Sequence, residues 1–143
     1  MKRVIVKFGL LAVIALTSAG VPANAQSLRD KLTVTIPFEF TVMDKKLPAG
    51  KYSVGRAQLS EGDLIIQISR VDGDESVSRI TIPVVARDAT KEGLLVFHQY
   101  GDEYVLAEIW PAGANTGRAL PKSRTERELE QKGGDQKVAQ VRF

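Results

Sequence analysis

The chain of 143 residues has no cysteine and a single histidine, His98. The lack of cysteine excludes disulfides, thiol nucleophiles and cysteine-ligated metal sites. One histidine cannot supply a site with several histidine ligands, and we expect His98 to be a packed, hydrogen-bonded structural residue rather than a catalytic one. The sequence also contains no G-x-S-x-G motif, so a serine nucleophile has no support. These observations predict neither a metal nor a cofactor.

The only long apolar run lies at the N-terminus. It begins with three basic residues, Lys2, Arg3 and Lys7. An apolar core follows at residues 8–16, and Ala23 and Ala25 form an A-x-A cleavage site before Gln26. This layout predicts a secretory signal peptide over residues 1–25. A spanning helix needs about 20 apolar residues, so we expect no stable membrane span after cleavage and an exported protein, either periplasmic or extracellular.

Charge of one sign is not in excess once the signal peptide is removed. The whole chain has 20 basic and 17 acidic residues, and three of the basic residues lie in residues 1–25. Residues 26–143 therefore hold 17 of each sign and have a net charge of zero. Nucleic-acid binding depends on a basic surface that displaces counterions, so we expect no nucleic-acid partner.

Alternating hydrophobicity dominates the rest of the chain. Every second residue from Leu32 to Val42 is apolar, which predicts a strand with one buried face. Pro37 and Pro83 lack an N–H, so their strands are expected to be sheet edges or to bend there. Further strand patterns are separated by turn signals such as Asp72-Gly73-Asp74. We therefore predict one mainly β domain over residues 26–117, an antiparallel sandwich or partly open barrel of six to seven strands.

A polar segment over residues 118–143 follows this domain. Ser123 and Glu126 match a capping box and predict a short helix, which Gly133-Gly134 would end. Leu129 is its one apolar residue, so we expect the helix to lie on the surface. Polar and apolar residues alternate again from Lys137 to Phe143, which predicts that the end of the chain is extended.

Candidate binding residues gather in the predicted hairpin around Gly101-Asp102. Tyr100, Tyr104 and Trp110 are a possible aromatic platform for a glycan or a peptide. Aromatic rings in a small β domain more often fill the core, so the sequence leaves both roles open. Oligomeric state is equally open.

Four carboxylates offer the one catalytic scheme that the composition allows, as general acid and base in a polysaccharide hydrolase. They are Glu39, Asp102, Glu103 and Glu108. No spacing pairs them, and carboxylates on turns and outer strand faces usually serve solubility. The enzyme therefore remains the alternative to a binding protein.

Three motifs together resemble a family of small exported bacterial proteins without an established activity. They are Phe38-x-Phe40-x-Val42, Leu47-Pro48-Ala49-Gly50-Lys51-Tyr52-x-Val54, and Ala119-Leu120-Pro121-x-Ser123 with Glu126 and Glu128. The resemblance implies a β-rich envelope or extracellular protein and transfers no catalytic or ligand-binding residues. Our main hypothesis is thus a non-enzymatic interaction module that binds an envelope protein or a glycan. Binding through a strand edge predicts that Thr35→Pro abolishes partner capture without unfolding the domain.

Overall fold

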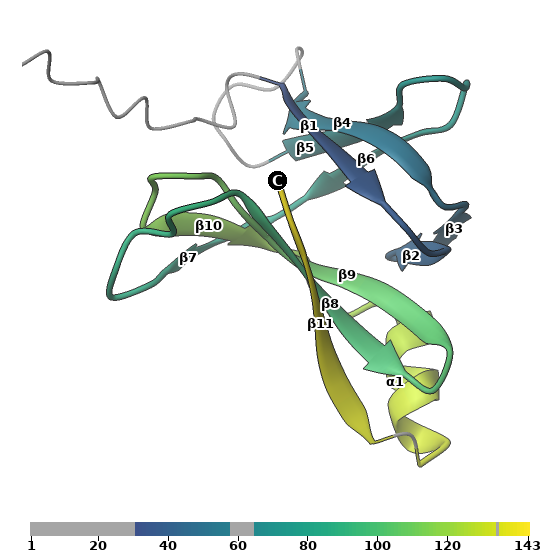
Figure 1. Cartoon of the computed structure of the whole chain (residues 1–143). Helices are drawn as coiled ribbons and strands as arrows, with labels where there is room; N and C mark the ends of the chain where they lie inside the picture. The colour runs from purple at the N-terminus through teal and green to yellow at the C-terminus, as the bar shows by residue number, and fades with distance from the viewer. Residues whose placement is uncertain (1–30, 58–64, 134) are drawn as a thin grey trace, which may run out of the picture.

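The computed structural model describes residues 31–57, 65–133 and 135–143, so the predicted signal peptide and its cleavage residues Ala23, Ala25 and Gln26 lie outside the described residues. The described part contains eleven strands and one helix. The strands form two open sheets that lie one above the other (Figure 1). The predicted mainly β class with a short C-terminal helix is therefore confirmed.

The smaller sheet contains four antiparallel strands. In spatial order they are β1 (Leu32–Ile36), β4 (Gly50–Arg56), β5 (Ile65–Arg70) and β6 (Ser76–Ile80). β1 and β6 are its two edges.

The larger sheet is built around the predicted aromatic hairpin. Its main path is β11 (Gln136–Arg142), β8 (Leu94–Tyr100), β9 (Glu103–Trp110), β10 (Thr116–Ala119) and β7 (Ile82–Val85). A hairpin of β2 (Phe40–Val42) and β3 (Lys45–Leu47) joins β9 through a parallel bridge between Thr41 and Val105. Of residues 118–143, the end of β10 and the whole of β11 thus belong to this sheet.

The strands outnumber the six or seven predicted for two reasons: two long strands are divided between the sheets, and β3 and β10 form in segments where no strand was predicted. The alternating run from Leu32 to Val42 breaks after Ile36, since Pro37 cannot donate a ladder hydrogen bond. Its first part is β1 of the small sheet and its second is β2 of the large sheet. The predicted strand around Ile82 divides at Thr81, which is 2% exposed where the chain crosses from β6 to β7.

The core fills the space between the two sheets. Phe40 packs edge-on against Tyr52 and Phe97, with ring centroids 5.2 and 5.7 Å apart. Aliphatic side chains from both sheets surround these rings, including Val34, Ile36, Val54, Ile66, Ile68, Leu95, Leu106 and Ile109. Each large side chain buried in this way stabilises the fold by about 1.5–3 kcal/mol.

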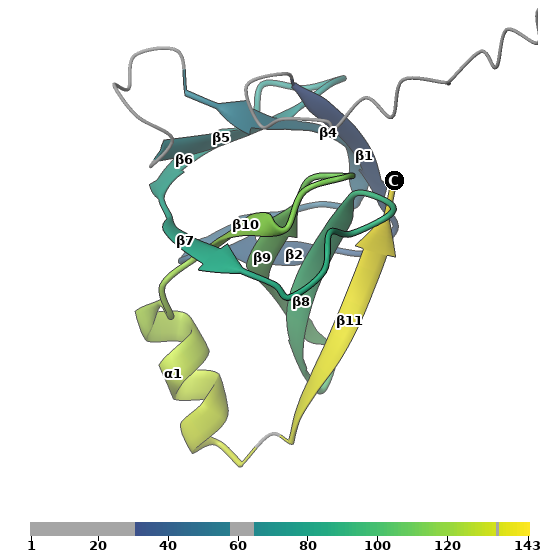
Figure 2. The same cartoon turned by 90° about the vertical axis from the view of Figure 1, so that its left-hand side faces the viewer.

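Helix α1 (Arg124–Gln131) lies at the end of the large sheet that is remote from the small sheet (Figure 2). The Ser123 hydroxyl accepts a hydrogen bond of 3.1 Å from the Glu126 N–H, which confirms the predicted N-cap. Leu129 is only half-buried, whereas Glu126 is 3% exposed. The helix thus lies on the surface of the large sheet, and a buried carboxylate, which the sequence analysis did not anticipate, contributes to its anchorage.

Candidate functional site

The hydrogen bonds of the small sheet determine which backbone groups of β1 face outward at its edge. In an antiparallel pair, the N–H and C=O of one residue point to the same neighbour, and successive residues alternate. The Val71 N–H donates to the Lys51 carbonyl at 2.9 Å, and the Ala57 N–H donates to the Ile65 carbonyl at 3.0 Å. Odd-numbered residues of β4 therefore bond to β5, and its even-numbered residues bond to β1.

The same alternation exposes the backbone of two threonines on β1. Thr33 lies opposite Ser53 and Thr35 lies opposite Lys51, so neither threonine is bonded to β4. Their N–H and C=O groups point away from β4, to the side of β1 on which no other described strand lies. The intervening Val34 bonds to β4 and is 2% exposed, so the backbone of this edge is fixed by its own core side chains.

Two other edges carry local protection of the kind that discourages strand pairing. On β6, the Ser76 carbonyl accepts from Lys45 Nζ and the Ser78 carbonyl accepts from the Arg79 guanidinium, both at 2.8 Å. On β7, Pro83 has no N–H to offer. β7 is a sheet edge, as its proline predicted.

A further edge strand, β11, has no described strand on its outer side, as is the case for β1. The Gly93 and Phe143 backbones exchange two hydrogen bonds of 3.0 Å, so odd-numbered residues of β11 bond to β8. Val138 and Gln140 therefore turn their backbone groups outward, and both side chains are exposed. Since β11 has no residue as deeply buried as Val34, its edge is less firmly fixed than that of β1.

A polar cluster joins helix α1 to the large sheet. His98 Nδ1 lies 2.6 Å from Glu126 Oε1, and the Tyr100 hydroxyl lies 3.2 Å from the same oxygen. Tyr100 also lies 3.2 Å from Glu130 Oε1, which forms an ion pair with Lys122. His98 is thus hydrogen-bonded within the fold, and the polar atoms of the cluster are in mutual contact.

Alkaline pH is expected to loosen this cluster through Tyr100. Burial, and then the neighbouring carboxylate of Glu126, raise the pKa of Tyr100 well above its ordinary value of 10. A raised pKa contributes stability that is complete below pH 10 and is lost as pH rises toward the folded-state value. We expect the midpoint of urea unfolding to fall between pH 8 and pH 11, and to fall less in Tyr100→Phe. An equal fall in both proteins would contradict this role.

The three predicted aromatic residues do not meet in one platform. Tyr100 and Tyr104 face opposite sides of the hairpin, since Tyr100 lies opposite Glu103 and Tyr104 lies opposite Gln99. Tyr104 stacks on Phe38 with centroids 4.0 Å apart. Trp110 is at the far end of the hairpin, where it is 9% exposed. Packing and hydrogen bonds thus account for the position of each ring.

The four candidate carboxylates are divided between two places. Glu39 and Glu103 share Lys46, whose Nζ lies 2.9 and 3.4 Å from their oxygens. Asp102 is exposed in the turn beside Glu103, whereas Glu108 accepts a hydrogen bond of 2.8 Å from the Trp110 indole. A hydrolase needs two carboxyl groups on either side of one glycosidic bond, whereas Lys46 lies between Glu39 and Glu103 and contacts both.

Comparisons of the chain with protein-family models, curated proteins and solved structures find no match. Within the described residues, no helix has the length and apolar character needed to cross a membrane. In the same part of the chain, no three acidic or histidine side chains converge as metal ligands.

The sequence pattern identified β1 but did not show which of its backbone groups face outward. That property depends on the register against β4, which alternation of side chains does not encode. The contact between His98 and Glu126 was also missed, because the two residues are 28 positions apart. The capping-box motif located Glu126, but it predicts a bond to the helix's own N-terminus.

Proposed function

We propose that this chain is an exported, non-enzymatic interaction protein that captures an extended segment of an envelope protein along the open edge of β1. The observation that carries the proposal is the outward orientation of the Thr33 and Thr35 backbone groups on a strand fixed by buried side chains. A partner strand gains affinity from main-chain hydrogen bonds at such an edge. The predicted signal peptide supports the envelope as the compartment.

β1 is favoured over β11 because less ordering is needed when a partner binds. Leu32, Val34 and Ile36 are 4%, 2% and 1% exposed, so their backbone is already in the geometry that a partner strand requires. Binding to a preformed edge avoids most of the conformational entropy cost of ordering it. On β11 the corresponding side chains are exposed or half-buried.

Site-specific crosslinking in the native cells tests the proposed edge. Because the chain has no cysteine, Thr33→Cys gives a single attachment point for a photoactivatable label. We expect one discrete crosslinked product from this position. A label on Gln140→Cys, which lies on the other open edge, should give none.

A proline on the proposed edge tests the main-chain hydrogen bonds directly. Thr35→Pro removes an outward N–H but leaves the β1–β4 ladder intact, so capture is expected to be lost while the melting temperature stays close to that of the wild type. Thr35→Ala keeps the N–H and should retain capture. Gln140→Pro is the matched change on β11 and should also retain it. Loss of capture in Gln140→Pro with retention in Thr35→Pro would overturn the proposal.

A further inference from the structure

The outer face of the small sheet carries a row of hydroxyl groups. Thr33, Ser53, Ser69 and Ser76 lie directly opposite one another across β1, β4, β5 and β6. Gln67 Nε2 donates to Ser76 Oγ at 3.1 Å, and the hydroxyls of Ser69 and Ser76 are 3.1 Å apart. Cross-strand hydrogen bonds therefore fix part of this polar surface in position.

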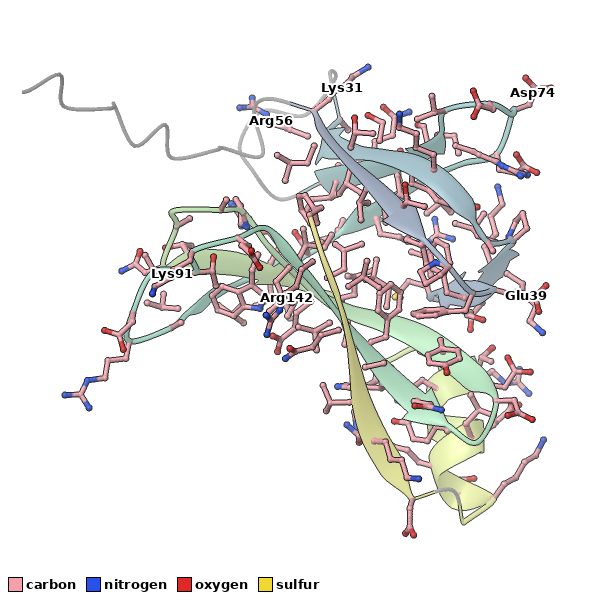
Figure 3. All side chains as sticks on the ribbon, in the orientation of Figure 1. Lys31, Glu39, Arg56, Asp74, Lys91 and Arg142 are labelled. Atoms are coloured by element: carbon pink, nitrogen blue, oxygen red, sulfur yellow. The ribbon has the colours of Figure 1, made fainter. Side chains whose placement is uncertain are left out.

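A hollow of about 280 Å³ lies on this face. Among the described residues that line it, the charged ones are basic and none is aromatic. Figure 3 shows Lys31 and Arg56 at one end of the small sheet and Asp74 at the other end. The residues that give the hollow its chemistry are Lys31, Arg56, Arg70, Ser53, Gln67 and Ser69.

The lining restricts which ligands fit. Serine hydroxyls both donate and accept hydrogen bonds, as sugar hydroxyls do, and the glutamine amide adds two donors and an acceptor. The basic side chains favour a negative charge, although Arg56 and Arg70 also interact within the protein, Arg70 with Glu75 at 3.4 Å. A neutral sugar would usually stack on an aromatic ring, which the described lining residues do not provide. The volume is near the lower end for ligand pockets, which suits one or two sugar rings.

We propose that this hollow binds a carboxylated sugar unit of an acidic polysaccharide. The carboxylate lies toward Lys31, and the sugar hydroxyls exchange hydrogen bonds with Ser53, Ser69 and Gln67. This site is on the face of the small sheet and is separate from the backbone groups at the β1 edge. Its ligand is of a different class from the partner strand proposed above.

Amide chemical-shift mapping of the protein over residues 26–143 tests the site. The probes are trisaccharides of galacturonate, glucuronate and N-acetylneuraminate, with a neutral galactose trisaccharide and inorganic sulfate as controls. We expect saturable shifts in β4 and β5 with at least one acidic trisaccharide, weakening as salt is raised. Shifts with sulfate equal to those with the acidic sugars would overturn the proposal, as would the absence of binding by all three.

Variants of the hollow separate specific from general attraction. Ser69→Leu fills the hollow and is expected to weaken binding more than tenfold, whereas Lys31→Gln is expected to weaken it about two- to fivefold, as a partly exposed ion pair would. Lys137→Gln removes a matched charge from β11 and should leave binding unchanged. An equal loss in Lys31→Gln and Lys137→Gln would contradict the site. Thr35→Pro should bind the sugar normally. A loss of partner capture at the β1 edge can therefore be distinguished from a loss of sugar binding in the hollow.

Discussion

Replacing Glu126 by alanine is expected to lower the free energy of unfolding by about 3 kcal/mol. The carboxylate is 3% exposed and lies within hydrogen-bond distance of His98 and Tyr100, at 2.6 and 3.2 Å. Removing it leaves His98 Nδ1 without that partner, whereas the Tyr100 hydroxyl keeps Glu130. A buried group left unsatisfied costs about 1–3 kcal/mol. Helix α1 needs such contacts, because an isolated helix of eight residues is unstable in water. Its link to the β2–β3 turn, from Thr125 to Asp44, is exposed and is expected to contribute less.

Urea unfolding at pH 7, followed by far-ultraviolet circular dichroism, measures this loss. Glu128→Ala is the matched control, since Glu128 is exposed and its ion pair is with Arg124 on the same helix. An exposed pair of this kind contributes only about 0.3–0.5 kcal/mol. Equal effects of the two substitutions would show that the cluster does not anchor the helix.

The helix illustrates how far the sequence predicts this structure. Ser123 and Glu126 were enough to locate the N-cap because capping depends on residues three positions apart. The burial of Glu126 depends on β8, which is distant in sequence and carries His98 and Tyr100 on the face toward the helix. Local motifs do not encode such a contact, so the helix was predicted correctly and its anchorage was not.

The strands also show which features of the fold the sequence pattern does not predict. Alternation identified the buried face of β1 correctly, and Pro37 correctly marked a break. Neither pattern shows that the chain changes sheets at Pro37 and again at Thr81, because both sheets bury the same kinds of side chain. The open edge of β1 thus follows from the topology, and the hollow on the outer face follows from the register of three strand pairs.

Replacing Tyr52 by alanine is expected to cost about 3–5 kcal/mol, the range for removing a large buried aromatic side chain. Tyr52 is 0% exposed, packs edge-on against Phe40, and lies opposite Val34 in the β1–β4 pair. Its hydroxyl also donates a hydrogen bond of 2.6 Å to the Pro48 carbonyl. One residue therefore joins the core, the β1 strand and the turn before β4.

Tyr52→Phe separates these contributions, because it keeps the ring and removes the hydroxyl. We expect a loss of about 1 kcal/mol, since Pro48 is half-buried and water can reach its carbonyl. Thermal and urea unfolding of the two variants measure the difference, and Tyr52→Phe should retain partner capture. If Tyr52→Phe cost as much as Tyr52→Ala, the turn contact rather than the core would dominate. If Tyr52→Ala costs more than Tyr52→Phe, as expected, the Leu47–Val54 motif is a determinant of the fold. Its Tyr52 then holds β1 in place, and β1 is the strand that we propose binds the partner.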